Sequence, residues 1–348
     1  MHFGIEIWEV ETMKRVILLV ALVVILAATV GCEWAPYISN PQPDPTKTIE
    51  VNKGEVIHFS ANAGDLNKED VVTFRWTATG GSPTSGSGKE FTWTASGEIG
   101  TVATIMFAVS DGRSTTERIW TVNIVYKEGF ETGSVGWMGT GLWHHQANSL
   151  ILNTAFRDGY VVLPTGDDSG GYIPYAKSGQ YCYWYGKDSQ GNYMGNQAAG
   201  DGYYSGGTSA LPNSGELTSP EIDLGVLQNP VLQFASWFEI EGQEPTTNDI
   251  MEVYISVNNG AFNYVGKLNP IMSEPGAASI PYTSGGIDNP ACWDLRYYSL
   301  ANYIGQRIRV KFVFNTMNIF RNGFRGWFID DVKIVNDTAR SISAKALN

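Results

Sequence analysis

The sequence predicts an all-β protein in which a small sandwich is followed by a larger one. The 348 residues include 39 glycines, and Val, Ile, Thr, Tyr and Trp recur in short alternating runs between turn residues. Beyond the N-terminal region we find no stretch with apolar residues at helical spacing. With 43% hydrophobic and 12% aromatic residues, the chain can bury a sizeable core in each of two domains.

Residues 1–32 are interpreted as an export signal. A basic pair precedes an apolar run over residues 16–30, which is shorter than the roughly 20 residues that span a bilayer. The run ends in Thr-Val-Gly-Cys32, which resembles the bacterial lipoprotein signal, in which the Cys receives lipid and becomes the first mature residue. Acidic residues spoil the basic flank upstream, so we expect the true start at Met13. The alternative is an uncleaved signal anchor; either way, the rest of the chain is expected outside the cytoplasm, held at a membrane through Cys32.

The charge and the cysteines exclude some classes of partner. With 23 basic against 35 acidic residues the net charge is -12, which argues against nucleic acid as a partner. An anionic surface tolerates cations and neutral sugars better than phosphates. Cys182 and Cys292 are the other two cysteines, and either a disulfide between them or two free thiols fits an exported protein. His144 and His145 are adjacent and would point to opposite faces of a strand, so we expect packed structural histidines and no zinc site.

The first domain is expected at residues 48–126, after a spacer. Residues 33–47 are Pro-rich and polar, which favours an extended linker. Short strand candidates then follow one another between turns rich in Gly, Asn and Asp, as in a small β-sandwich. These candidates are residues 48–51, 56–61, 71–77, 89–94, 102–110 and 119–125.

Two runs in this domain carry a family resemblance. Phe74-Arg75-Trp76, and Ala108-Val109-Ser110-Asp111-Gly112 before the last strand, resemble bacterial immunoglobulin-like domains of the PKD-like kind. The resemblance implies an immunoglobulin-like sandwich that acts as a spacer.

The second domain is expected at residues 127–337, with a tail at residues 338–348. Its length is ordinary for a jelly roll with long loops. Several aromatic and glycine runs follow in order, and together they resemble the MAM-like jelly-roll modules of secreted bacterial proteins, including those that accompany immune inhibitor A type peptidases. The resemblance implies a non-catalytic module for adhesion or substrate contact, often with a structural cation. The runs include Gly129-Phe130-Glu131, Leu142-Trp143-His144, Tyr183-Trp184-Tyr185-Gly186, Trp237-Phe238-Glu239 and Gly326-Trp327-Phe328-Ile329-Asp330-Asp331.

The last of these runs continues to Ile334 and reads as a strand with two adjacent carboxylates. Simple alternation places Phe328, Asp330, Val332 and Ile334 on one face and Trp327, Ile329, Asp331 and Lys333 on the other. Whichever face is buried, it takes one aspartate inside. A buried carboxylate costs several kcal/mol unless an arginine, backbone N–H groups or a cation compensates it.

We expect a structural calcium ion as this compensation. In a jelly roll the first and last strands lie side by side, so Glu131 could converge with Asp330 or Asp331. Asp249, before the candidate strand at residues 251–257, is a weaker further ligand. The alternatives are that Asp330 pairs with an arginine or caps backbone N–H groups. The arginines concerned are Arg309 and Arg325.

Tyrosines in the Gly-rich stretch 181–204 are candidates for ligand contact. Tyr193, Tyr203 and Tyr204 are placed on a loop, where aromatic faces can stack on sugars or anchor a protein. The alternating tyrosines at the start of this stretch are expected to enter the core.

Catalysis has weaker support. Glu239 and Glu241 share one face of a strand and could in principle form a glycosidase pair, but a solvent face or a cation ligand suits them better. No G-x-S-x-G or HExxH motif is present. The sequence therefore predicts a surface-anchored, non-catalytic protein that binds an extracellular glycan or protein. The alternatives are a glycan-active hydrolase and a purely structural envelope component.

Overall fold

The computed structural model describes residues 34–133, 135–147, 173–188, 191–194, 208–241, 248–269, 282–285 and 291–337, together with Arg15. From residue 34 onward these residues form β-strands joined by turns, with one 3₁₀ helix, η2 (Ala301–Tyr303). The predicted all-β class is confirmed. No helix in this described part is long and apolar enough to cross a membrane.

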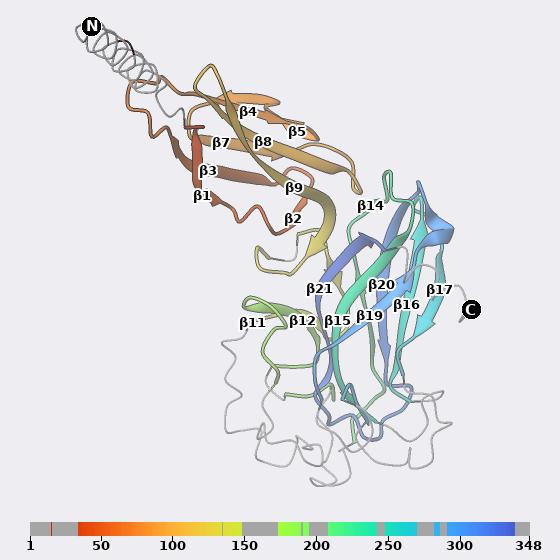
Figure 1. Ribbon diagram of the computed structural model, residues 1–348. Coiled ribbons are helices and arrows are strands. Elements are labelled where there is room, and N and C mark those ends of the chain that lie inside the picture. The colour runs from red at the N-terminus through yellow and green to blue at the C-terminus, as the bar shows by residue number, and fades with distance from the viewer. Residues whose placement is uncertain are drawn as a thin grey trace, which may run out of the picture.

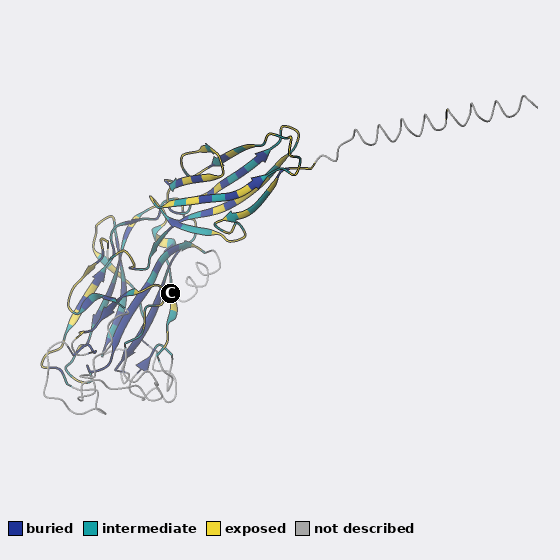
Figure 2. Ribbon diagram, turned by 90° about the vertical axis from the view of Figure 1, so that its left-hand side faces the viewer, coloured by how far each residue is buried: buried dark blue, intermediate teal, exposed yellow. Residues whose placement is uncertain are grey.

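The first sandwich packs two sheets around three buried tryptophans, Trp76, Trp93 and Trp120. One sheet has the order β1-β3-β7-β5, and the other contains β2, β9, β8, β4 and β6 (Figure 1). Buried and exposed residues alternate along its strands, as Figure 2 shows. Its strands are β1 (Tyr37–Gln42), β2 (Ile49–Asn52), β3 (Val56–Gly64), β4 (Thr73–Ala78), β5 (Gly81–Ser82), β6 (Ser85–Ser87), β7 (Glu90–Ala95), β8 (Val102–Ser110) and β9 (Thr115–Glu128).

Strand β1 lies inside the segment predicted to be a spacer. It pairs with β3, and the Trp120 indole N–H donates to the carbonyl of Pro43 at 2.6 Å. Prolines are tolerated here because β1 is an edge strand, where a missing backbone donor breaks no ladder. The described part of residues 33–47 therefore belongs to the first sandwich, and the prediction of an unstructured linker was wrong there.

Strand β9 belongs to both sandwiches. It pairs with β8 and, in parallel, with β2 in the first sandwich, whereas its residues Tyr126 to Glu128 pair with β21 of the second. In Figure 1 it runs from the first sandwich at the upper left into the second at the lower right. The predicted boundary at residues 126 and 127 thus falls within one continuous strand. A further contact joins the sandwiches, because Ile99 is buried in the core of the second one.

The second sandwich is larger and encloses its own core. One sheet has the order β10-β13-β20-β16-β17, with β14 beside β20, and the other contains β11, β12, β21, β15, β18 and β19. Its strands are β10 (Met138–Gly139), β11 (Trp143–Ala147), β12 (Tyr181–Tyr185), β13 (Ser214–Thr218), β14 (Ile222–Asp223), β15 (Pro230–Ile240), β16 (Ile250–Val257), β17 (Phe262–Lys267), β18 (Tyr282–Thr283), β19 (Asp294–Ser299), β20 (Arg307–Asn315) and β21 (Gly326–Asn336).

A β-bulge interrupts β21 at the two aspartates. Two residues of β21, Asp331 and Val332, stand opposite the single residue Phe234 of β15, and Asp331 has a φ of 49°. The extra residue reverses the alternation. Trp327 and Ile329 before the bulge, and Val332 and Ile334 after it, all enter the same core. The strict alternation predicted for this strand was therefore wrong beyond Asp330, and Asp330 is the aspartate that is buried.

The outer face of the same sheet carries a row of aromatic rings in register. Trp184, Phe328 and Trp237 are direct neighbours on β12, β21 and β15, and all three are buried in a small cluster of their own. The rings of Trp184 and Phe328 stack with centroids 5.1 Å apart. The Trp184 indole lies over Gly186, where a Cβ atom would come within 2.0 Å of the ring.

Gly186→Ala is therefore expected to destabilise the second sandwich by on the order of 2 kcal/mol or more, because Trp184 must leave its rotamer. Thermal unfolding checks this as a lowered midpoint. Gly129→Ala is the matched control, since its new Cβ would meet nothing closer than Asp331 Oδ1 at 3.7 Å. Equal midpoints for the two variants would contradict the packing of Trp184 on Gly186.

Candidate functional site

The two aspartates of the bulge hold the segment before β12. The backbone N–H of Ser178 donates to Asp330 Oδ2 at 3.2 Å, and the N–H of Asp331 donates to Asp330 Oδ1 at 2.7 Å. The Ser178 hydroxyl donates to Asp331 Oδ1 at 2.6 Å. Asp330 is fully buried, whereas Asp331 is partly exposed. Burial first, and then the charge of Asp331, raise the pKa of Asp330 to about 7.

Glu131 approaches the same segment from the other side. Its carboxylate accepts the N–H groups of Gln180 at 2.9 Å and 3.0 Å, and that of Tyr181 at 2.9 Å. Gly179 has a φ of 62°, and a Cβ there would lie 2.2 Å from Glu131 Cδ. The chain can therefore close over the carboxylate only with glycine at this position. Glu131 and Asp331 thus both reach residues 178–181, through backbone and hydroxyl donors. The oxygens of Glu131, Asp330 and Asp331 are not among the described groups of three that lie within 4.8 Å of one another, so the predicted convergence on one ion is not seen directly.

Backbone N–H groups, and not an arginine, compensate the carboxylate of Asp330. Arg309 donates to Asn259, and Arg325 pairs with Glu239, so neither arginine compensates Asp330. Its carboxylate caps backbone N–H groups, the second alternative. Across the described residues, no lysine or arginine forms an ion pair with Glu131, Asp330 or Asp331. Within the described residues, neutral donors alone balance the three carboxylates.

Glu131 and Asp331 open onto a cleft of about 810 Å³ where the two sandwiches meet, whereas Asp330 lies buried behind it. Lysines on its wall are engaged: Lys127 pairs with Glu55 at 3.4 Å, and Lys333 pairs with Glu50. The remaining carboxylates give the cleft an excess of negative charge. Its lining is Glu50, Asn52, Glu55, Lys127, Glu128, Gly129, Glu131, Thr132, Gln233, Asp331, Val332 and Lys333.

Asp249 does not join this group, so its prediction as a shared ligand was wrong. It is fully buried beside Tyr193, whose hydroxyl donates to Asp249 Oδ2 at 2.5 Å, and the N–H of Glu241 donates to the same oxygen at 2.6 Å. Burial raises the pKa values of both Asp249 and Tyr193 well above their usual ranges. Tyr193 has no exposed surface, so its prediction as a ligand contact was also wrong. Tyr203 and Tyr204 lie outside the described residues.

Glu239 and Glu241, the candidate catalytic pair of a hydrolase, each form an ion pair with an arginine. Arg325 pairs with Glu239 at 2.5 Å, and both side chains are almost completely buried. Arg321 pairs with Glu241 at 3.1 Å, and Glu241 is only 5% exposed. The Arg325 guanidinium also lies over the Trp237 ring, 4.9 Å from its centroid. These carboxylates are thereby fixed as parts of the scaffold.

The remaining predicted residues have structural roles or lie outside the described chain. Cys182 is buried and Cys292 is exposed, and both are free thiols, so no disulfide joins them. His144 contacts Asp188 at 2.8 Å, and His145 contacts the Phe130 carbonyl at 2.8 Å, as expected of packed histidines. Cys32 lies outside the described residues.

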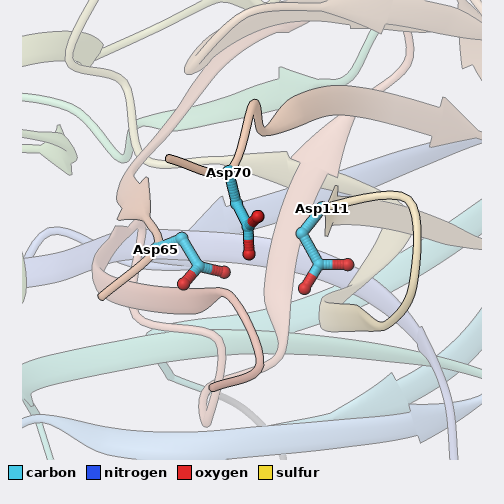
Figure 3. Close-up of side chains that lie close together, drawn as sticks. All are labelled: Asp65, Asp70 and Asp111. Atoms are coloured by element: carbon cyan, nitrogen blue, oxygen red, sulfur yellow. The ribbon is translucent and has the colours of Figure 1, made fainter. Parts of the chain in front are cut away.

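A group of carboxylates that the sequence did not reveal lies at one end of the first sandwich. Asp65 and Asp70 border the β3–β4 loop and Asp111 follows β8, and one oxygen from each lies within 4.8 Å of the others. Figure 3 shows the three side chains converging. The Oδ2 atoms of Asp65 and Asp70 are buried without a hydrogen-bond partner, whereas Asp111 accepts N–H groups of its own turn. Hard oxygen donors of this kind suit calcium.

A second feature missed from the sequence is an aromatic face, formed by Tyr254, Phe262 and Tyr264. These residues lie on the outer side of β16 and β17, and Tyr264 is 56% exposed. The Tyr254 and Tyr264 rings meet edge to face with centroids 5.7 Å apart. Lys311 Nζ lies 5.3 Å from the Tyr254 centroid and 4.4 Å from that of Phe262. The register of β16 with β17 brings these residues together. In the sequence they show only the alternation of an ordinary half-buried strand, which does not mark them as a group.

Two polar contacts fix this aromatic face. The Tyr254 hydroxyl donates to Glu252 Oε2 at 2.6 Å, which raises the pKa of Tyr254 to about 12. Lys311 pairs with Glu216 at 2.8 Å. Glu252 and Lys267 face each other across β16 and β17. The face thus combines partly exposed rings with charged side chains of both signs.

Comparisons with known proteins give similar solved structures only. No protein-family model matches the chain, and no curated protein matches it. The K1 cleaved adhesin domain of Lys-gingipain from Porphyromonas gingivalis W83 is 16% identical, with 62% of this chain and 99% of that chain covered and a TM-score of 0.33. A carbohydrate-binding module of the β-sandwich superfamily is 12% identical, with 87% and 99% covered and a TM-score of 0.30.

A module that recognises mannan is 9% identical, with 62% of this chain and 98% of that chain covered and a TM-score of 0.27. At these TM-scores the likeness decides nothing about function, which must come from the side chains.

The raised pKa of Asp330 predicts a pH dependence of stability in calcium-free buffer. Between about pH 4 and about pH 7, Asp330 is deprotonated in the unfolded chain but still protonated in the folded protein. The folded state therefore binds more protons, and the free energy of unfolding falls as the pH rises. Asp330→Asn should remove this part of the slope. Denaturant titrations across the range measure it, and equal slopes in the two proteins would contradict a neutral Asp330.

Proposed function

We propose that this chain is an exported, lipid-anchored protein that binds a neutral extracellular glycan without acting on it. The observation that carries the proposal is the aromatic face of Tyr254, Phe262 and Tyr264. On this face, partly exposed aromatic rings and hydrogen-bonding side chains share a single sheet surface.

The rings supply the apolar part of sugar recognition. A pyranose presents a face of C–H groups that packs on an aromatic ring, and Tyr264, at 56% exposed, offers such a ring. Around the rings, Glu252 and Lys267 supply an acceptor and a donor for hydroxyl groups. The sheet below is rigid because its inner side packs against the main core, through residues such as Val253 and Phe312.

The pairing of charges on this face favours an uncharged glycan. Lys311 already pairs with Glu216, so an acidic sugar would have to break that pair to bind Lys311. Glu252 and Lys267 stand opposite each other in register, so neither sign of charge dominates this face. The net charge of -12 further disfavours acidic polymers.

Retention without turnover follows from the state of the acidic residues. Glu239 and Glu241, the candidates for a hydrolase, are each paired with an arginine and buried. A catalytic acid and base must reach the scissile bond from a shared cleft, which these side chains do not.

We further propose that a structural calcium ion binds beside the cleft between the sandwiches. Among the described residues, the partners of Glu131, Asp330 and Asp331 are neutral, and calcium prefers carboxylate and carbonyl oxygens. A bound ion would neutralise Asp330 in place of a proton and would tie the start of the second sandwich to its last strand.

Glycan binding is tested with the full chain in detergent against a panel of soluble neutral glycans and one uronate polymer. Tyr264→Ala is expected to weaken binding of the retained glycan roughly tenfold, through loss of about 1.4 kcal/mol of ring contact. Tyr37→Ala is the matched control, because Tyr37 is a 45% exposed tyrosine of the first sandwich. Calorimetry measures both. Binding that survives Tyr264→Ala, or retention of a protein and of no glycan, would contradict the proposal.

At pH 7.5, removal of calcium by a chelator is expected to lower the thermal midpoint of the unsubstituted protein to about the midpoint of Asp330→Asn. The midpoint of Asp330→Asn itself should not change when the chelator is added. Asp294→Asn should keep the response, because Asp294 pairs with Arg296 on β19, which β15 separates from β21. If neither the chelator nor Asp330→Asn changes the midpoint, there is no ion at this site.

A further inference from the structure

The end of the first sandwich farthest from the second one carries exposed apolar side chains. Leu66 and Val71 lie in the β3–β4 loop and are 63% and 82% exposed, and Trp34, at the start of the described chain, is 55% exposed. The backbone N–H of Trp34 donates to Asn67 Oδ1 at 3.1 Å, which fixes Trp34 beside this loop. Single exposed apolar residues are common on proteins, so these three side chains indicate a binding surface only in combination with their location.

Their position relative to the proposed anchor is set by the covalent chain. Trp34 follows Cys32 by two residues, and two residues span at most about 7 Å. A lipid on Cys32 would place Cys32 at the membrane surface and therefore holds the Trp34 backbone within about 7 Å of that anchor. The hydrogen bond to Asn67 brings the β3–β4 loop to the same place. The second sandwich contacts the opposite end, where the Val226 N–H donates to the Ile99 carbonyl at 3.3 Å.

We infer that this end of the first sandwich docks on the bilayer, with Trp34, Leu66 and Val71 in the lipid headgroup region. The inference rests on the proposed lipid anchor and adds an orientation to it. Tryptophan and aliphatic side chains favour this region. A sandwich on a long flexible tether, by contrast, would not keep one particular end toward the lipid.

Charge selects the kind of lipid. Asp65, Glu69, Asp70 and Asp111 lie at this end and outnumber Lys68 and Arg113 there, so the end is negative when no cation is bound. Anionic headgroups would repel these carboxylates, so a zwitterionic surface such as phosphatidylcholine is the partner that fits.

Two residues of equal exposure provide the test. Leu66 and Val102 are each 63% exposed, but they lie at opposite ends of the first sandwich, because β8 runs nine residues, roughly 30 Å, from Val102 to Ser110 beside the aspartates. Spin labels are placed by Leu66→Cys or Val102→Cys in the full lipidated chain, with the exposed Cys292 changed to Ser and the buried Cys182 left in place.

In phosphatidylcholine vesicles, the ratio of label collisions with oxygen to those with a water-soluble nickel chelate is measured. The ratio is expected to rise on membrane binding at position 66 and to stay unchanged at position 102. A second readout avoids new cysteines: brominated phosphatidylcholine should quench part of the tryptophan emission, and Trp34→Phe should abolish that part.

Flotation with the vesicles and the mass of the lipidated chain report the anchor separately. If the chain floats but the ratio is the same at both positions, docking is wrong and the anchor stands. If the chain carries no lipid and does not float, both are wrong.

Discussion

The structure of the second sandwich depends on the bulge in β21. This strand pairs with β12, β15 and β9, so any error in its alternation would propagate into three neighbours. The additional residue lets Ile329 and Val332 enter one core from a strand that otherwise would turn one of them outward. Asp331 accepts the left-handed conformation that the bulge requires, and Asp330 caps the N–H of Asp331. The two aspartates therefore serve first of all to accommodate the backbone of the bulge.

Two sets of carboxylates differ in their partners. Glu239 and Glu241 lie against arginines and are balanced inside the scaffold. Those facing residues 178–181, and those at the far end of the first sandwich, have neutral donors or none among the described residues. Burial therefore does not distinguish a structural acid from one that could hold a cation. The charge of the nearest donor does, and it becomes visible only in three dimensions.

Local periodicity predicted much of the fold. Strand β8 spans the expected residues 102–110, and the tyrosines at 183 and 185 enter the core as their alternation indicates. What periodicity could not show depends on contacts distant in sequence. The bulge is an offset against β15, β1 is held by β3 in spite of its prolines, and the burial of Tyr193 reflects its bond to Asp249. The aromatic face likewise exists only through the register of β16 with β17.

Strand β9 gives the molecule a mechanical property. Its residues at 122–125 pair with β2, and those at 126–128 pair with β21, so no unpaired linker separates the two sandwiches. A pull on the second sandwich, from a ligand attached to a moving surface, would be carried by a backbone already paired on both sides. Extension at the junction would require breaking strand pairing, whereas a flexible linker would simply straighten. The two sandwiches therefore transmit tension as a stiff rod.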